Sequence, residues 1–488
     1  MTQPSSLKQE VLRSLAWSGG LRYLGQIITW GITLFVIRLL NPDDYGLMAK
    51  AYLCIGFLVM FSELGLAAAV VQKKDINHYQ LGQVFGFVIL VNVFMAILLF
   101  SGAPLAAHFF GDGRLIPIFR FLSVVFLLIA CYVVPDALLT REMDFQRKSM
   151  VELLGAIVSS GTTLFLALHG YGVWSLVWGV IGNYFMVALS YHVVKRVWIR
   201  PRFRFQGFKY FASFGGLMTA NRIFWYLYSQ ADIFIASRFL SNSLLGTYSV
   251  AANLSSMPLD KVAPIMNQVA FPAYSSIKND TGLVRSHFLK SVRLVSLIAF
   301  PLFWGLLATS PEFIPMFLSP KWSGLIIPLQ LLCIIMPLRM LGTLFAPVFQ
   351  GLGDVKITLV NNLIIFVVMV FAFCIGIKWG VSGICIGWVL GYSAAFAAIC
   401  RRSLLVLRIS IRAFLSSMEV PFIAGLCMVV LLLAIKQHVN IIGYSYLLLG
   451  MCILIGGVVY VGLIFMMSRD LLREILTLLK RREARNSI

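Results

Sequence analysis

The stretch VIRLLNPDDYG at 36–46 ends one long apolar segment, and ASRFLSNSLLG at 236–246 ends another 200 residues later. Within these stretches three residue pairs match at this offset: Arg38 with Arg238, Leu40 with Leu240, and Gly46 with Gly246. Arg22 with Arg222 and Ala51 with Ala251 match at the same offset. An arginine in the last turn of a helix is favoured by the helix dipole, and a glycine permits a tight turn or close helix packing. The repetition therefore predicts duplicated architecture first. A hinge or gate is a secondary interpretation.

The composition is that of a membrane protein. Of the 488 residues, 60% are hydrophobic and 12% are charged, and the mean hydropathy is +0.89. So little polar surface excludes a soluble globule. Apolar stretches of about 20 residues, the length that spans a bilayer as a helix, predict an all-α polytopic protein of about 14 transmembrane helices. These begin near residues 17, 45, 81, 115, 150, 172, 209, 244, 294, 325, 357, 380, 419 and 443.

The net charge of +21 lies mainly in alternate loops. If consecutive helices alternate sides, one set of loops holds about 28 Lys and Arg and the other about five. Cytoplasmic loops carry the excess, which places both termini and the loop near 195–209 in the cytoplasm. This asymmetry accounts for the basicity without nucleic acid. The basic tail at 468–488 has the pattern of an amphipathic helix lying on membrane lipids, or of a solvated cationic end.

Further matches extend the repeat. Asp144 in REMDF matches Asp354 in GLGDV at an offset of 210, and GYGVWSLVWG at 170–179 matches KWGVSGICIG at 378–387 at an offset of 208. Internal repeats of this length indicate a duplicated fold. The chain is therefore predicted to contain two six-helix halves, followed by an extra helix pair with a basic tail. Their expected bounds are 1–200, 201–400 and 401–488. Because six is even, the halves are parallel repeats, which in transporter folds place a substrate site at their interface.

Several of these stretches together carry a family resemblance. Tyr45-Gly46 after RLLNPDD, the echo SRFLSNSLLGTYSVA at 237–251, REMDF and GYGVWSLV resemble the polysaccharide-export branch of the multidrug/oligosaccharidyl-lipid/polysaccharide flippase superfamily. The resemblance covers essentially the whole chain. It implies two helical lobes around a central cavity, and transfer of undecaprenyl-pyrophosphate-linked oligosaccharide across the bacterial inner membrane. It also implies partnership with a polysaccharide polymerase and a chain-length regulator.

Polar side chains recur at intervals of three and four residues in four of the predicted helices, so each set shares one helix face. Such stripes in apolar helices predict a common watery interior. The residues expected to line it are Ser18, Gln26, Thr29, Tyr226, Asn253, Ser256 and Asn267.

Cations at membrane depth are candidates for substrate binding. Each charge costs roughly 2.5–3.5 kcal/mol at the bilayer centre, so it requires a cavity or a partner. A guanidinium matches the oxygens of a pyrophosphate with bidentate geometry. We expect Arg22, Arg222 and Arg339 to form the core of this site, with Lys50 and Lys261 as further candidates. In the alternative interpretation, these cations snorkel to the surface or neutralise buried acids.

Acidic groups at similar depth are candidates for coupling transport to a cation gradient. Glu63, Asp232 and Asp260 have the chemistry to bind a proton or Na⁺, or to neutralise Lys50 or Lys261. Net export requires an energy source, and a membrane potential supplies about 2.3 kcal/mol per charge per 100 mV.

Three other functions are alternatives. A multidrug or cation antiporter fits the same superfamily, but the first helix has an arginine and no carboxylate. A flippase for another lipid-linked cell-wall precursor fits the cations equally well. A membrane polysaccharide polymerase or glycosyltransferase needs a carboxylate or metal site, and the longest outward loop, near 309–324, carries only Glu312. The eight cysteines and six histidines lack ligand spacing, so no metal, cofactor or enzymatic activity is expected.

Overall fold

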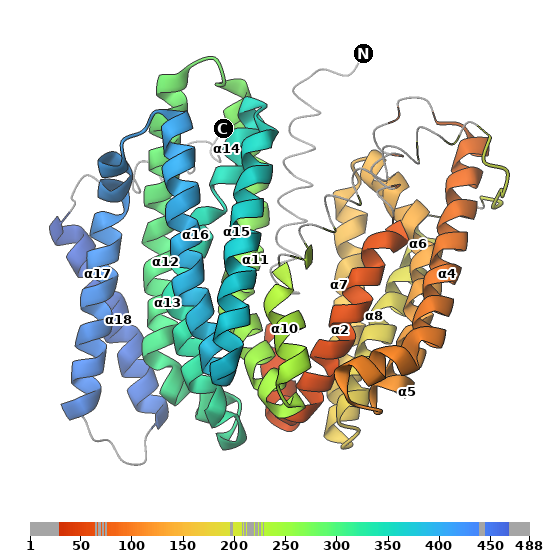
Figure 1. The fold of residues 1–488 in the computed structure, drawn as a ribbon, viewed down its shortest axis with the longest axis horizontal. Coiled ribbons are helices and arrows are strands. Elements are labelled where there is room, and N and C mark those ends of the chain that lie inside the picture. Colours follow the sequence, from red (N-terminus) through yellow and green to blue (C-terminus); the bar gives the residue numbers. More distant parts are fainter. Residues whose placement is uncertain are drawn as a thin grey trace. The chain divides into compact units, whose positions relative to one another are not determined.

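The computed structural model describes residues 29–63, 76–195, 199–206, 229–438 and 445–467, and single positions 66, 70, 73, 208, 211, 219, 223, 226 and 227. The chain divides into two compact units, Met1–Gly246 and Thr247–Ile488. Both units consist of packed helices (Figure 1). Ten helical segments of the described residues are long and apolar enough to span a membrane, which supports the expected polytopic helical fold.

The first unit contains the helices up to α10 and the start of α11. Its helices are α2 (Pro42–Glu63), α4 (His78–Phe110), α5 (Leu115–Leu122), α6 (Val124–Arg141), α7 (Phe145–Leu168), α8 (Val173–Val194) and α10 (Ala231–Phe239), and a short apolar helix at Thr29–Leu39 precedes them. Helices α4, α6, α7 and α8 lie side by side (Figure 1). The core of this unit is apolar and includes Phe119, Phe126 and Ile129, which have no exposed surface.

The second unit holds most of α11 (Asn242–Ser276) and the remaining helices. These are α12 (Thr281–Phe317), η1 (Pro320–Leu325), α13 (Ile326–Gly342), α14 (Phe345–Leu352), α15 (Val355–Gly376), η2 (Ile377–Trp379), α16 (Gly380–Leu407), α17 (Ile411–His438) and α18 (Ser445–Met467). The C-terminal pair α17 and α18 packs on α12 through a core that includes Ala308, Met428 and Cys452.

Polar caps set several helix boundaries. The Asn77 side chain accepts from the Gln80 amide at 2.8 Å before α4, and Asp280 accepts from the Leu283 amide at 3.0 Å before α12. These side chains satisfy amide groups that have no partner within the helix. Gly111 ends α4 in the left-handed conformation, at φ 69°. Because Asp280 caps α12, this helix begins well before the apolar stretch from which it was predicted.

Residues matched in the sequence have similar backbone conformations. Gly172 precedes α8 at φ 54° and ψ −132°, and its match Gly380, the first residue of α16, has φ 67° and ψ −146°. Asp144 precedes α7 at φ −81° and ψ 68°, and Asp354 precedes α15 at φ −98° and ψ 60°. Residues that match in the sequence thus lie at the start of corresponding helices in nearly the same conformation.

The glycines of the opening stretches form a reciprocal contact. A Cβ on Gly46 would overlap the carbonyl oxygen of Asn242, the first residue of α11, and a Cβ on Gly246 would overlap that of Pro42, the first residue of α2. The close packing expected of these glycines is therefore present. Helix α10 also packs against α2 and α4. The first compact unit consequently extends to Gly246, beyond the expected end of the first repeat at 200.

One expectation about the loops was wrong. The outward loop expected near 309–324 is mostly helical, because α12 continues to Phe317 and η1 begins at Pro320. Three prolines lie within α12 at 301, 311 and 315, and the helix nevertheless continues through them. Proline and the polar residues around it are typical of loops, but an apolar environment removes the competing hydrogen bonds of water and favours an intact helix.

Candidate functional site

Arg339 is one of two predicted substrate-binding cations whose side chains the structure describes, and Lys50 is the other. Arg339 lies in the last turn of α13, near the middle of the apolar segment Pro320–Leu352, and its side chain is half-buried. Its guanidinium carbon lies 4.1 Å from the centre of the Trp388 ring, and one N–H group faces the Met336 sulfur at 3.6 Å. Within the described part of Thr247–Ile488, Arg339 has no ion pair.

The ring beneath Arg339 is fixed in place. Trp388 is 3% exposed, and its indole N–H donates to the hydroxyl of the fully buried Tyr248 at 2.9 Å. Phe373 meets the indole edge-on at 5.2 Å. The resulting site is a partly exposed guanidinium on a buried aromatic platform.

Lys50 occupies a different environment. It is 3% exposed, and its amine donates to the carbonyl of Phe110, the last residue of α4, at 3.3 Å. The carbonyls at a helix C-terminus attract a cation. In this structure Lys50 therefore joins α2 to the end of α4.

Tyr226 contacts α2. Its hydroxyl donates to the Leu53 carbonyl at 2.7 Å, and its ring lies close to Gly56 and Phe57. The side chain is 7% exposed. Its polar group is thus used in packing in this conformation, although the sequence predicted that it lines a cavity.

Three residues of the polar stripe predicted on α11 lie on an accessible face. Asn253 and Asp260 are exposed and Ser256 is half-buried. The Ser256 hydroxyl donates to the Asp260 carboxylate at 3.1 Å, one helical turn away. The structure therefore brings these two predicted residues together.

The other predicted residues fall into three groups, according to how much of each the structure describes. Asp232 lies in the first turn of α10, is 5% exposed and accepts a hydrogen bond from the Ile233 amide at 2.8 Å. Thr29 is half-buried, and its carbonyl accepts from the Thr33 hydroxyl at 2.7 Å. The backbones of Glu63, Lys261 and Asn267 lie in α2 and α11, but their side chains are outside the described part. Ser18, Arg22, Gln26 and Arg222 lie outside the described residues altogether.

A polar clasp, formed by Asp43, Asp112, Arg114 and Asn242, lies next to the reciprocal glycine contact. Arg114 pairs with Asp43 at 2.7 Å and with Asp112 at 2.8 Å, and the Asn242 amide donates to Asp112 at 2.6 Å. Hydrogen bonds from Arg114 lower the pKa of Asp112 from its ordinary value of 3.8 to about 2. The clasp therefore links the start of α2, the α4–α5 turn and the start of α11.

Sequence reasoning missed two ion pairs at membrane helices. Asp136 in α6 pairs with Lys148 in α7 at 2.7 Å and also accepts from the Tyr191 hydroxyl. Glu312 in α12 pairs with Lys436 in α17, and both side chains are mostly buried. In each pair the two residues lie on different helices, so the spacing of residues along one helix could not predict that they meet.

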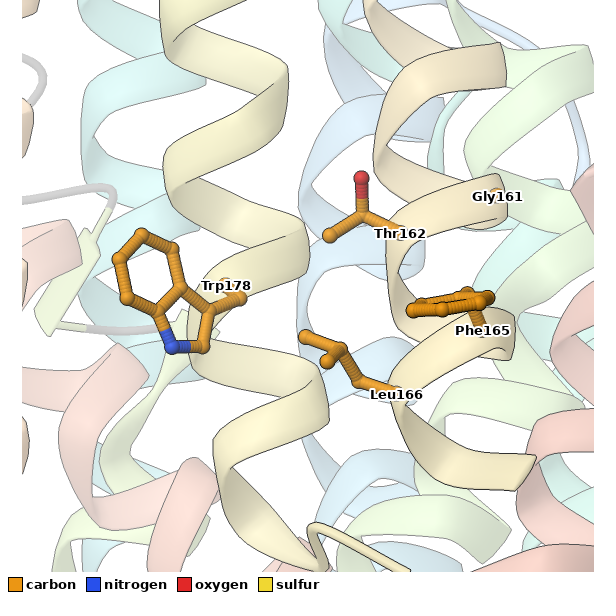
Figure 2. A pocket seen from close by; sticks show the side chains of 5 residues that line it. All are labelled: Gly161, Thr162, Phe165, Leu166 and Trp178. Atoms are coloured by element: carbon orange, nitrogen blue, oxygen red, sulfur yellow. The ribbon is translucent and has the colours of Figure 1, made fainter. Parts of the chain in front are cut away.

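A pocket of about 430 Å³ lies between α7 and α8. Figure 2 shows Thr162, Phe165 and Leu166 of α7 on one side and Trp178 of α8 on the other, and Gly161 completes the lining. No charged side chain lines this pocket, so it does not fit a pyrophosphate. Among the described residues there is also no group of three acidic, His or Cys side chains that could hold a metal ion.

Comparisons with known proteins agree with this architecture. The lipopolysaccharide biosynthesis protein WzxC of Escherichia coli (strain K12) is 25% identical over 393 residues, which cover 79% of each chain. The succinoglycan biosynthesis transport protein ExoT of Rhizobium meliloti (strain 1021) is 25% identical over 494 residues, which cover 99% of this chain and 98% of ExoT.

The fold is also that of a solved flippase. The lipid II flippase MurJ, in an inward closed conformation, superposes with a TM-score of 0.76 at 16% identity, over 94% of this chain and all of MurJ. The family described as polysaccharide biosynthesis protein matches residues 35–327. Since this match covers more than half of the sequence, the chain belongs to the polysaccharide biosynthesis protein family.

Proposed function

We propose that this protein is a flippase of the bacterial inner membrane that moves undecaprenyl-pyrophosphate-linked oligosaccharide repeat units for exopolysaccharide, capsule or O-antigen assembly. The names of its relatives, a lipopolysaccharide biosynthesis protein and a succinoglycan transport protein, support the substrate class. The family match and the helical fold support transport as the activity. In this proposal the two repeats act by alternating access, both termini are cytoplasmic, and no catalytic step takes place.

Arg339 carries the proposal. A charge in the middle of a membrane segment costs roughly 2.5–3.5 kcal/mol and requires a partner or water. Lys436 and Lys148 have carboxylate partners, whereas the described contacts of Arg339 are an aromatic ring and a thioether. A guanidinium held over an aromatic ring keeps N–H groups that can bind phosphate oxygens. We therefore assign Arg339 to the pyrophosphate.

The remaining predicted residues stay part of the proposal. Arg22, Arg222 and Lys261 are proposed as further phosphate-binding groups, and Glu63, Asp232 and Asp260 as sites for a coupling cation. Lys50 is a weaker candidate because its amine is engaged with Phe110. The lobes are proposed as 1–200 and 201–400, with 401–488 as the accessory helix pair.

The test is leaflet transfer of a labelled undecaprenyl-pyrophosphate oligosaccharide in proteoliposomes, with and without an imposed pH gradient. We expect transfer by the wild type and a loss of at least about tenfold in Arg339→Ala, the effect of removing a charged hydrogen-bonding group. The exposed Arg412 provides the matched control Arg412→Ala, which should transfer normally.

Three outcomes would separate the alternatives. Normal transfer by Arg339→Ala would remove Arg339 from the phosphate site. Transfer of lipid II in place of the oligosaccharide lipid would favour another cell-wall precursor. Transport of drug cations without either lipid would favour the multidrug antiporter.

A further inference from the structure

We propose that Trp388 is a positioning residue for substrate binding. Its indole face, which lies 4.1 Å from the guanidinium carbon of Arg339, holds the guanidinium in place, so that its N–H groups are presented to the pyrophosphate. This inference rests on the proposed function, because it assigns a role to the residue that supports the proposed phosphate ligand. It does not require Trp388 to touch the substrate.

The packing of α13 against α16 brings the side chains of Arg339 and Trp388 together. Arg339 and Gly342 are three residues apart on α13, and Trp388 and Tyr392 are four apart on α16, so each pair shares one helix face. A Cβ on Gly342 would overlap the Tyr392 hydroxyl, which shows how closely the helices approach one turn away from Arg339. Arg339 therefore meets Trp388 through the same packed interface.

The Trp388 ring is held by its neighbours, and the Arg339 guanidinium over it is partly exposed. Trp388 is held by the hydrogen bond to Tyr248 and by the edge contact with Phe373, and it is 3% exposed. Arg339 remains half-buried. A free arginine side chain has many rotamers, and holding it on a fixed ring removes much of the ordering cost of binding.

Stacking also leaves hydrogen-bonding groups available. A guanidinium over an aromatic ring is attracted through its face, whereas its N–H groups point outward in its own plane. A carboxylate partner at this position would compete with a phosphate for those groups. An aromatic partner stabilises the same cation without doing so.

The experiment measures affinity for undecaprenyl pyrophosphate with the full chain in lipid nanodiscs. We expect Arg339→Ala to lose at least about tenfold in affinity, and Trp388→Leu to lose about tenfold. Trp388→Phe, which keeps a ring face, should stay within about threefold of the wild type. Trp379 in η2 is 68% exposed and supplies the matched control Trp379→Leu, with unchanged affinity.

The double variant decides the role of Trp388. If the tryptophan acts through Arg339, then Trp388→Leu should have no further effect in an Arg339→Ala background. Equal losses in both backgrounds would overturn the inference, because Trp388 would then contact the lipid or affect the fold. Undecaprenol, which lacks phosphate, should bind all variants alike; a loss of its binding in Trp388→Leu would also overturn the inference.

A second readout does not depend on the substrate. In protein containing 5-fluorotryptophan, the ¹⁹F resonance of Trp388 is identified as the one that disappears in Trp388→Phe. This resonance should shift in Arg339→Leu in the absence of any ligand. An unshifted resonance would contradict the contact itself. If Arg339→Ala keeps the wild-type affinity, both the proposed phosphate site and this inference are overturned. If Arg339→Ala loses affinity and the effects of Arg339→Ala and Trp388→Leu add up in the double variant, this inference alone is overturned.

Discussion

Gly46 and Gly246 meet where α2 and α11 begin, and a Cβ on Gly246 would lie 2.7 Å from the amide nitrogen of Gly46. Each glycine also packs against the carbonyl of the first residue of the opposite helix, Asn242 or Pro42. Because these residue pairs are separated by the same offset of 200, the contact is reciprocal. The repeated glycines in the sequence are thus explained by the close approach of two equivalent helix starts.

Alanine at either glycine should therefore destabilise the protein. In an ordinary helix, Gly→Ala stabilises by up to about 1 kcal/mol, but here the added methyl group overlaps backbone and should cost about 1–3 kcal/mol. We expect a lower Tm for Gly46→Ala and Gly246→Ala in detergent. Gly102 in α4 has no atom within 4 Å of an added Cβ and is the control. A Tm equal to that of Gly102→Ala would contradict the close contact.

The polar clasp should contribute stability that depends on pH. A carboxylate with a lowered pKa stabilises the folded state above its ordinary pKa, and this contribution is lost as the pH falls through the folded value. For Asp112 that window runs from pH about 4 to about 2. In Arg114→Gln the pKa should return toward 3.8, so the acid-induced fall in Tm should become smaller.

At neutral pH the same substitution should have a small effect. Arg114 is 57% exposed, and exposed ion pairs contribute about 0–1 kcal/mol. Arg412→Gln, at an exposed arginine, should leave the pH profile unchanged. An identical acid profile in Arg114→Gln and the wild type would show that Arg114 does not control Asp112.

The sequence predicted the helical elements better than their ends. The positions of the apolar stretches predicted the starts of four helices to within a few residues, because these stretches begin near the first turns of the helices. The four are α2, α4, α8 and α16. In contrast, α12 begins at Thr281, where Asp280 caps the helix and basic residues follow in the next turns, although the apolar stretch pointed to residue 294. Hydropathy detects the membrane segment and not the part of a helix that extends into water.

The site was predictable only in part. A lone arginine in an apolar stretch identified Arg339 as a candidate, because a charge at that depth is costly. Its aromatic support was not predictable, since Trp388 lies on another helix and an isolated tryptophan in a membrane segment is ordinary. For the same reason, the burial of Lys50 against Phe110 emerged only from packing.

The buried pair of Glu312 and Lys436 should hold α17 on α12. Both side chains are about one-eighth exposed, at 12% and 13%. Removing one partner of a buried pair leaves an unpaired charge and costs about 3 kcal/mol. Lys436→Met should therefore lower the Tm clearly, and the double variant Lys436→Met/Glu312→Leu should recover part of the loss.

The control for this pair is a similar pair at the surface. Arg147 and Asp144 lie 3.3 Å apart, and Arg147 is 58% exposed. Arg147→Met should change stability by less than about 1 kcal/mol. If both substitutions have the same effect, or if the double variant is less stable than Lys436→Met, the pair does not secure the C-terminal helices.

Residues 199–206, which we call the linker strap, are held against α4, and this contact should protect them from proteolysis. The Gln83 side-chain amide donates to the Arg204 carbonyl at 2.6 Å and to the Gln206 carbonyl at 3.0 Å, and the Arg202 amide donates to the Gly82 carbonyl at 2.8 Å. Gln83→Leu removes two of these three hydrogen bonds, at a cost of about 0.5–1.5 kcal/mol each.

Release of the strap should accelerate tryptic cleavage after Arg202 and Arg204, because a protease needs an extended, detached segment. The exposed Arg408, between α16 and α17, serves as the internal reference site. We expect faster cleavage of Gln83→Leu at the strap relative to this reference in inside-out vesicles. Equal ratios in the two proteins would show that Gln83 does not hold the strap, and cleavage confined to right-side-out vesicles would place the loop outside the cytoplasm.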